Sequence, residues 1–269
     1  MFTYLDPTVR ERLVDAGHLI RIDRDGQSID VNSENGSGTI SILGPIPLPI
    51  AFGEDRYEAR WYACVRNTQL SKVEHIAETL RAEKAQESFA TLATSMAVNS
   101  VLVFGDVDGW TDPLVRVHSS CLTGDVFGSE RCECGPQLQS AIELIDADEQ
   151  GGMLIYMSGH EGRGIGLWAK AATYLLQDGG ENTYEANRSL GLPDDSRDFS
   201  DAASLIKHFR GDGPLRLLTN NPKKVNDLND SGIFDITPVK HVFGVTESNK
   251  RYLSAKRDWG HELADDDIK

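Results

Sequence analysis

Residues 116–137 read RVHSSCLTGDVFGSERCECGPQ and join a predicted strand to a predicted helix. The stretch contains three of the chain's four cysteines: Cys121, Cys132 and Cys134. Thiolates are soft ligands that suit Zn²⁺, and three protein ligands leave the fourth tetrahedral position of the metal for water. The alternative is a set of reduced cysteines packed in a core, because free cysteine is among the most buried residue types. The spacing alone leaves both interpretations open.

Strands and helices alternate around this stretch. Apolar runs bounded by turn residues predict strands at 100–107, 114–120, 151–157 and 215–219. Apolar positions at helical spacing predict helices from 136 onward and at 167–178, 200–210 and 222–230. The helix at 167–178 carries one face made of Leu167, Ala171, Tyr174 and Leu175. The alternation indicates an α/β fold with one main domain.

The first part of the chain has a different character. Residues 1–44 contain a possible short helix at 7–16 and period-2 patches at 18–31 and 37–43, so we expect a small β-rich N-terminal extension. Residues 45–65 alternate apolar and polar side chains, and their prolines suit an edge strand or the start of a strand. Residues 66–98 are rich in helix formers and predict an ordinary packed helix, with a dimer contact or a lid as alternatives. Residues 263–269 form an acidic tail that we expect to be solvated.

Charge and composition exclude several classes of protein. The chain has 27 basic and 42 acidic residues and a formal net charge of −15, which repels nucleic acid and anionic membranes. No apolar run is long enough for a membrane span, and the N-terminus lacks the apolar region of a signal peptide. Four cysteines, three of them clustered, fit a reducing compartment better than a disulfide framework. We therefore expect a cytoplasmic protein that binds neither nucleic acid nor membranes.

Two further motifs suit a phosphorylated ligand. In HEGRGIG (160–166) the glycines allow close approach of the backbone to a ligand, although a simple strand-to-helix turn explains them equally well. In LLTNNPKK (217–224) an Asn–Pro pair fits the N-cap and first position of a helix, whose free N–H groups bind phosphate. The alternative there is a solvated lysine pair on a capped helix.

The cysteine stretch resembles the zinc-binding signature of GTP cyclohydrolase II, the riboflavin-pathway enzyme that opens the guanine imidazole ring. The resemblance continues in order through HEGRGIGL (160–167), EANRSLG (185–191), DDSRDF (194–199) and LLTNNPKK (217–224), and it covers roughly residues 100–262. It implies a catalytic domain at 45–262 with a mixed sheet, in which 66–98 is a helical insertion. It also implies one Zn²⁺ per subunit, Mg²⁺ with the triphosphate, and a homodimer. The implied products are formate, pyrophosphate and 2,5-diamino-6-ribosylamino-4(3H)-pyrimidinone 5′-phosphate.

The resemblance also assigns roles to individual residues. It makes Cys121, Cys132 and Cys134 the zinc ligands, Asp195 the general base and Arg197 the nucleophile that captures the α-phosphate. A guanidinium stays protonated in proteins, so Arg197 is a poor nucleophile and a natural clamp for the transition state. Tyr174 matches a position near the reacting base, with packing of its helix as the equal alternative. The implied contacts to GTP are Arg116, Val117, His118, Ser119, Ser120, Gln137, Glu161, Gly162, Arg163, Thr183, Thr219 and Lys224.

Two positions depart from the family pattern. Ser120 stands where a Glu normally precedes the first cysteine, and Ser158 stands where an Arg commonly precedes GHEGR. Two hydroxyls cannot replace a carboxylate and a guanidinium, so a charge pair or two substrate contacts are missing. Three hypotheses follow: GTP cyclohydrolase II activity, a related hydrolase that stops at the formamide or uses another nucleotide, and an idle zinc-stabilised nucleotide-binding protein. About 110 residues precede the cysteine motif, so we expect no fused dihydroxybutanone phosphate synthase domain.

Overall fold

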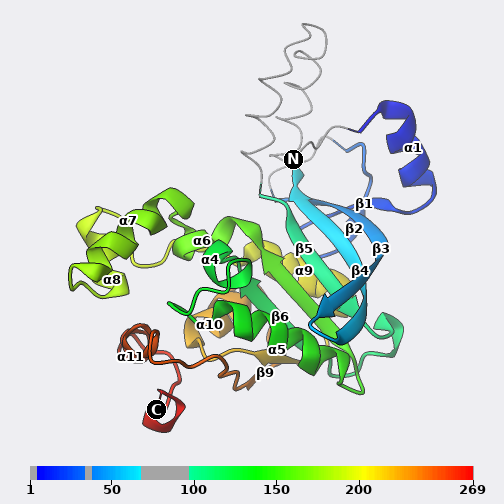
Figure 1. The fold of residues 1–269 in the computed structure, drawn as a ribbon. Helices are drawn as coiled ribbons and strands as arrows, with labels where there is room; N and C mark the ends of the chain where they lie inside the picture. Colours follow the sequence, from blue (N-terminus) through cyan, green and yellow to red (C-terminus); the bar gives the residue numbers. More distant parts are fainter. Residues whose placement is uncertain (1–4, 34–37, 68–96, 269) are drawn as a thin grey trace, which may run out of the picture.

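One mixed sheet organises the molecule (Figure 1). The computed structural model describes residues 5–33, 38–67 and 97–268, so most of the predicted helical segment 66–98 lies outside the described residues. Within these ranges the sheet has nine strands in the order β2-β1-β3-β4-β5-β7-β6-β8-β9. Their bounds are β1 Leu19–Ile22, β2 Ser28–Ile29, β3 Ile40–Phe52, β4 Asp55–Arg66, β5 Asn99–Phe104, β6 Leu114–Ser119, β7 Gly152–Met157, β8 Leu215–Leu218 and β9 Ile236–Val239.

The sheet changes from antiparallel to parallel at β7. Strands β2, β1, β3, β4, β5 and β7 pair antiparallel, whereas β7, β6, β8 and β9 pair parallel. The carboxyl ends of β6, β7 and β8 therefore meet at one edge, which is where parallel α/β sheets bind their ligands. The mixed α/β fold predicted from the alternation of elements is confirmed.

The N-terminal strands extend the same sheet. Strand β1 pairs with residues 40–43 of β3, whereas residues 46–52 of β3 pair only with β4 among the described residues. Pro45, Pro47 and Pro49 lie in or just before this second part. Because one side of the strand is open there, the missing proline N–H groups cost few ladder hydrogen bonds. The prolines thus occupy the edge position that the sequence suggests.

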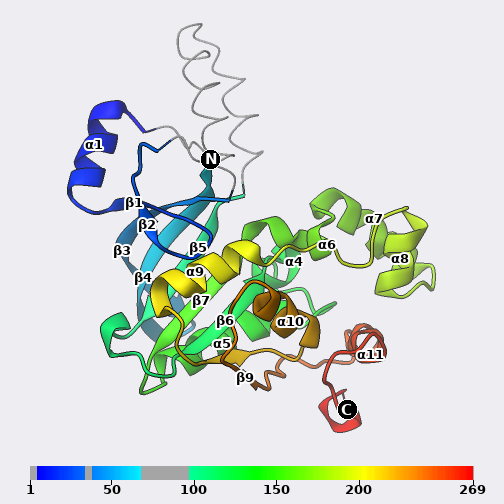
Figure 2. The same cartoon turned by 180° about the vertical axis from the view of Figure 1, so that it is seen from behind.

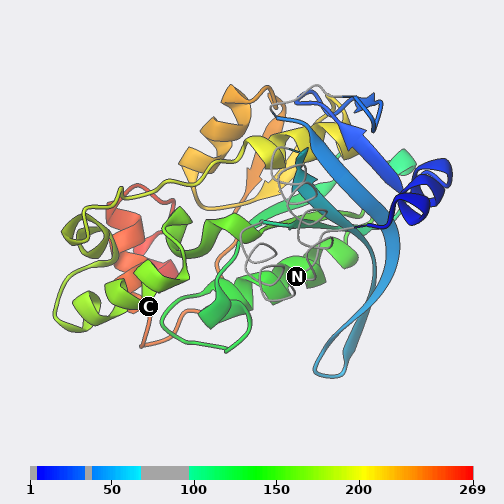
Figure 3. The same cartoon turned by 90° about the horizontal axis from the view of Figure 1, so that it is seen from above.

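Helices cover both faces of the sheet. Helix α5 packs on one face, and α9 and α10 pack on the other (Figure 3). The α9 side contains the larger apolar core, with Val115, Val117 and Ile155 fully buried. The helix bounds are α1 Pro7–Asp15, α4 Leu122–Asp125, α5 Cys134–Asp146, α6 Glu161–Gly164, α7 Leu167–Asp178, α8 Thr183–Ser189, α9 Ser200–Arg210, α10 Pro222–Asp230 and α11 Lys250–Asp258. The predicted helices at 7–16, 167–178, 200–210 and 222–230 are confirmed.

Three helices lie beyond the end of the sheet rather than on its faces. Helices α7, α8 and α11 group together on the side opposite β1 to β4, as two opposite views agree (Figures 1 and 2). Neither α8 nor α11 is predicted by the sequence. No helix in the described part of the chain is both long and apolar enough to cross a bilayer.

Helix α7 has a different orientation from the one that its sequence predicts. Its apolar residues face solvent: Trp168 is 91% exposed and Leu175 is 74% exposed. The side chains that α7 buries are Lys170 and Thr173, so the buried face of this helix is polar. Of the apolar face predicted at 167–178, Leu167, Ala171 and Leu175 are exposed, and Tyr174 is partly buried beside the cavity.

The acidic C-terminal residues form a short turn. Asp265–Ile268 is a 3-10 helix in which the side chain of Ile268 is buried. Ion pairs join Asp265 to Arg257 at 2.6 Å and Asp267 to Lys240 at 2.6 Å. The carboxylates of this segment thus have cationic partners and do not all point into solvent.

Candidate active site

The three parallel strand ends converge on one cavity. Strand β6 leads into Ser119, Ser120 and Cys121, β7 leads into the turn at 158–166, and β8 leads into the capped helix α10. Asn221 is the N-cap of α10 and Pro222 its first residue, as the sequence predicts. Of the predicted site residues, those that line the cavity are Arg116, His118, Ser119, Ser120, Cys121, Cys132, Cys134, Gln137, Glu161, Gly162, Arg163, Tyr174, Thr183, Arg197, Thr219 and Lys224.

Two predicted residues do not line the cavity. The side chain of Val117 is fully buried in the core, and only its carbonyl oxygen reaches the site, where it accepts a hydrogen bond from Lys224 Nζ at 2.7 Å. The carboxylate of Asp195 is 2% exposed and lies against Arg197. Both residues contact a cation that does line the cavity.

The three cysteines form a compact cluster of sulfur atoms. Their Sγ atoms lie within 4.8 Å of one another, and Cys121 Sγ is 3.6 Å from Cys132 Sγ. Cys121 follows β6 and Cys134 is the first residue of α5. A Cβ atom on Gly124 would lie 2.9 Å from Cys132 Sγ and 3.2 Å from Cys121 Sγ, so the cradle requires glycine there. A soft three-thiolate set of this size fits Zn²⁺, with one coordination position left open.

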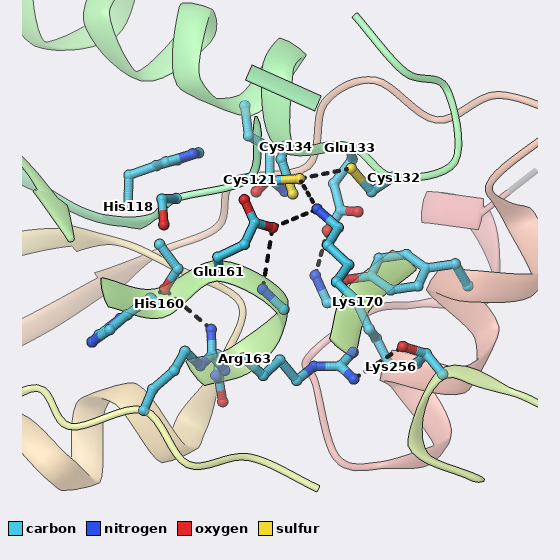
Figure 4. Close-up of a pocket in the computed structure, with 18 of the residues that line it drawn as sticks. His118, Cys121, Cys132, Glu133, Cys134, His160, Glu161, Arg163, Lys170 and Lys256 are labelled. Carbon is cyan, nitrogen blue, oxygen red and sulfur yellow. Dashed lines mark hydrogen bonds and ion pairs between the residues drawn. The ribbon is translucent and has the colours of Figure 1, made fainter. Parts of the chain in front are cut away.

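A buried ammonium compensates the charge of this cluster. Lys170 Nζ lies 3.1 Å from Cys121 Sγ and 2.6 Å from Glu161 Oε1 (Figure 4). Hydrogen bonds from Cys132 and Cys134 hold the pKa of Cys121 well below that of a free thiol, and Lys170 acts in the same direction. Cys121 is therefore favoured as a thiolate, which is the form in which cysteine binds a metal.

Asp125 fixes the start of the cysteine loop. Its Oδ2 accepts hydrogen bonds from the Cys121 backbone N–H at 2.9 Å and from Tyr156 Oη at 2.9 Å. His118 Nε2 lies 3.1 Å from Asp125 Oδ1, and burial lowers the pKa of His118. A neutral His118 donates through Nε2, which leaves Nδ1 as an acceptor; that atom is buried and makes no hydrogen bond within the described residues. The Nδ1 atom can therefore accept a hydrogen bond from a ligand.

A second network surrounds Arg197. Asp195 accepts two hydrogen bonds from this guanidinium, at 2.9 Å from Nε and 2.6 Å from Nη2. Arg197 Nη1 donates to Ser119 Oγ at 3.2 Å, and Ser119 Oγ lies 3.2 Å from His160 Nδ1. Burial lowers the pKa of His160 to about 4, so its ring is neutral near pH 7. Burial alone would raise the pKa of Asp195, but Arg197 brings it below the usual value.

Two buried cations have no acidic partner among the described residues. Arg116 donates to the Leu218 carbonyl at 2.8 Å and to Gln137 Oε1 at 2.9 Å, and burial lowers its pKa to about 10. Burial, together with repulsion from Arg116 and Arg197, brings the pKa of Lys224 well below that of free lysine. Uncompensated buried charge is costly unless a ligand neutralises it. In a chain with a net charge of −15, this clustering indicates an anion site.

The glycine-rich turn adopts a left-handed backbone. Gly162 has φ 60° and Arg163 has φ 63°, which is uncommon for a residue with a side chain and costs conformational energy. Glu161 Oε2 accepts a hydrogen bond from the Leu122 backbone N–H at 2.7 Å, which joins this turn to the metal loop. Arg163 Nη1 donates to Thr183 Oγ1 at 3.1 Å. The turn therefore carries both an acidic and a basic group at the cavity.

The two departures from the family pattern are neighbours in space. Ser120 Oγ donates to the carbonyl oxygen of Ser158 at 3.0 Å, and Ser158 Oγ donates to the carbonyl oxygen of Val98 at 2.5 Å. A Glu and an Arg at these two backbone positions would therefore be close enough to interact. This adjacency agrees with the interpretation that one charge pair is missing.

Sequence reasoning missed several lining residues. Lys170 was assigned only to a helix, and Tyr252, Lys256 and His261 carry no recognisable motif. His160, the first residue of the HEGRGIG motif, is 6% exposed and contacts Ser119. The one signal for Lys170 was its position shortly after the glycine-rich turn, where a helix must return toward the cavity.

Comparison with known proteins identifies the family. Residues 74–238, more than half of the chain, match the model of the GTP cyclohydrolase II family. The riboflavin biosynthesis protein RibBA of Mycobacteroides abscessus is 52% identical over 169 residues, which is 61% of this chain and 40% of that protein. RibBA of Nocardia farcinica is 50% identical over 163 residues, 60% of this chain and 39% of that protein. The chain thus spans about two fifths of the length of these relatives. The cavity, its cysteine cluster and the family match agree, and the chain belongs to the GTP cyclohydrolase II family.

Proposed function

We propose that the chain hydrolyses GTP in riboflavin biosynthesis, opening the guanine imidazole ring and releasing formate and pyrophosphate. The observation that carries this proposal is the meeting, in one cavity, of three clustered thiols and two buried cations that have no acidic partner in the described part of the chain. The first group suits a hydrolytic metal, and the second suits a polyphosphate. The similarity to RibBA proteins, which are named for riboflavin biosynthesis, supports the assignment to that pathway.

Each group of residues has a role in this proposal. Cys121, Cys132 and Cys134 would hold Zn²⁺, which when bound activates water for attack at C8 of the guanine. Arg197 stays protonated beside Asp195 and clamps the α-phosphate as charge develops on it. This favours a clamp over a nucleophile for Arg197, and it makes Asp195 the residue that orients the clamp.

The remaining contacts divide between the two ends of the substrate. Arg116 and Lys224 would face the phosphates, with Mg²⁺ sharing the charge of the triphosphate. Glu161 and the Nδ1 atom of His118 offer acceptors on the metal side of the cavity. Tyr174 Oη lies 3.0 Å from Thr123 Oγ1, close to the cysteine loop, where it can donate a proton to the opened ring.

The test is incubation of zinc-loaded protein with GTP and Mg²⁺, with products followed by mass spectrometry. Equimolar formate and pyrophosphate with the diaminopyrimidine would support the proposal. Unchanged GTP with zinc bound would contradict it and would favour an idle nucleotide-binding protein.

A second candidate is a hydrolase that stops at the formamide or uses another nucleotide. The contact between Ser120 and Ser158 favours it, because a charge pair near the cavity is replaced by hydroxyls. Accumulation of the formamidopyrimidine in the same assay would select this candidate. The double variant Ser120→Glu/Ser158→Arg would then be expected to restore deformylation.

The chain is also proposed to form a homodimer. The observation in favour is the apolar face of α7, where Trp168 and Leu175 are largely exposed. Large apolar side chains exposed on one helix are typical of surfaces that associate with another protein. Light scattering should give twice the chain mass, and Trp168→Ser should shift the protein toward monomer. A monomeric parent protein would contradict the proposal.

A further inference from the structure

Three cavity-lining residues come from a segment beyond the family match. Tyr252, Lys256 and His261 belong to α11 and the loop that follows it, whereas the match ends at residue 238. Leu253 is the one buried residue of α11, so little apolar burial holds this helix. Its attachments to the rest of the molecule are ionic, hydrogen-bonded and aromatic.

One attachment reaches the metal loop. Lys256 Nζ forms an ion pair with Glu133 Oε1, and Glu133 stands between Cys132 and Cys134 (Figure 4). The Glu133 side chain is 3% exposed, and its Oε2 makes no hydrogen bond within the described residues. Lys256 is thus the cation that neutralises a buried carboxylate placed between two metal ligands. Loss of Lys256 would leave that carboxylate uncompensated and disturb the loop.

The other attachment reaches the glycine-rich turn. The Arg163 guanidinium carbon lies 4.1 Å from the ring centre of Tyr184 and 5.8 Å from that of Tyr252. Tyr184 in turn stacks on Trp259, with ring centres 4.7 Å apart and planes 13° apart. Arg163 Nη2 is buried and has no partner within the described residues. The ring of Tyr184 from α8 and the ring of Tyr252 from α11 therefore lie beside an arginine that has an unused donor.

His261 closes the cavity next to these contacts. Its Nδ1 donates to the Lys256 carbonyl oxygen at 3.1 Å, and the backbone N–H of Glu262 donates to the Asn220 carbonyl oxygen at 2.8 Å. The loop after α11 is thus joined to the residue that precedes the N-cap of α10. The segment spans from the metal loop to the phosphate side of the cavity.

We propose that the C-terminal segment 240–262 forms one wall of the nucleotide site and contributes two positioning residues, each with its own effect on binding. Lys256 holds the metal loop in its zinc-binding geometry through Glu133. Tyr252 holds the Arg163 guanidinium toward a bound nucleotide. The second statement rests on the proposed function, because it takes a guanine nucleotide as the ligand; the first does not.

The two roles predict opposite patterns in two binding measurements. Lys256→Met should release Zn²⁺ to a chromophoric chelator about 10–100-fold faster than the parent protein, since outer-shell partners of metal ligands affect affinity by this factor. Lys256→Arg keeps the charge and should restore most of the retention. Lys250→Met is the matched control, because Lys250 is on the same helix, pairs with Glu247 and does not line the cavity.

Tyr252→Leu should instead weaken binding of an α,β-methylene analogue of GTP by about fivefold to tenfold, as expected for a lost cation–π partner. Its zinc release should match that of the parent protein. Tyr252→Phe keeps the ring and should bind the analogue normally. The variant Lys250→Met should change neither measurement.

The outcomes separate the inference from the proposed function. A parent protein that retains zinc but does not bind the analogue would contradict the proposed function, while the zinc measurements on Lys256 would still decide the first role. Normal zinc retention in Lys256→Met would overturn that role. Normal analogue binding in Tyr252→Leu, with tight binding by the parent, would overturn the second.

Discussion

The cavity has two walls that are built in different ways. The sheet wall consists of β6, the start of α5 and the β8–α10 connection, and five of the six residues of β6 are buried. The helical wall consists of α7, α8 and α11; α7 buries Lys170 and Thr173, and α11 buries Leu253. Apolar burial stabilises the first wall. Ion pairs, hydrogen bonds and ring stacking hold the second.

This difference indicates that the two walls have different functions. The sheet wall carries the zinc ligands, Arg116 and Lys224 on elements that the core holds in place. Small displacements of such residues would slow a reaction. The helical wall carries Lys170 and Lys256, whose contacts can open and re-form without unfolding the core. The predictions below test this contrast, beginning with the largest expected effect.

Removal of a zinc ligand should abolish the metal site and with it the activity. Cys132→Ser replaces a soft thiolate by a weak oxygen ligand, so we expect loss of bound zinc and a fall in formate release of more than about a thousandfold. The fold should persist, because the cysteine loop lies outside the two apolar cores. Metal analysis and circular dichroism check both statements. Cys64→Ala, a substitution in the core, should leave zinc content unchanged.

Asp195→Asn tests the clamp in the loop between α8 and α9. The amide removes the charge that orients Arg197, so pyrophosphate release should fall by about a hundredfold or more. Asp194→Asn is the matched control: Asp194 pairs with Arg188, whose side chain is 60% exposed, and the exchange should change activity less than twofold. Equal losses in the two variants would show that the whole 194–197 turn matters rather than the contact to Arg197.

The two walls also differed in how far the sequence could predict them. The strand at 114–120, the capped helix at 222–230 and the cysteine loop are signalled by local patterns, and all three were found where expected. The polar inner face of α7 was not, because the burial of Lys170 depends on contacts with Glu161 and Cys121 that form only in the folded chain. Helix α11 was missed because KRYLSAKRD contains few apolar residues, and of these only Leu253 is buried. A wall that is held by polar contacts leaves no apolar pattern from which a single sequence could predict it.

Lys224→Met should separate binding from stability in the sheet wall. Removing a buried cation without an acidic partner should raise the unfolding temperature by a few degrees. The same change should weaken GTP binding by about a hundredfold, because a charge-assisted contact to phosphate is lost. Lys223→Met, which loses only an i,i+4 pair with Asp227, should bind GTP normally. Parallel losses of stability and affinity in Lys224→Met would contradict an anion site.

The smallest effect concerns acid stability and compares one histidine from each wall. His160 has its pKa lowered to about 4 and His261 to about 3, in both cases first by burial. A free histidine titrates near pH 6.5, so below that pH these histidines bind protons in the unfolded chain but not in the folded chain. The stability that each group contributes is therefore complete above about pH 6.5 and is lost as the pH falls toward the folded value.

The walls should make these two histidines behave differently. His160 lies in the turn after β7 and contacts Ser119 at the end of β6, so we expect its protonation to require unfolding of the sheet, and the loss between pH 7 and pH 5 should be about 2 kcal/mol. His261 lies in a loop held by polar contacts, so local opening of α11 exposes it and its larger shift should contribute less. Urea unfolding at both pH values should thus show a flatter pH dependence in His160→Gln and little change in His261→Gln. Equal flattening in both variants would mean that α11 opens only with the core, and that the two walls form one cooperative unit.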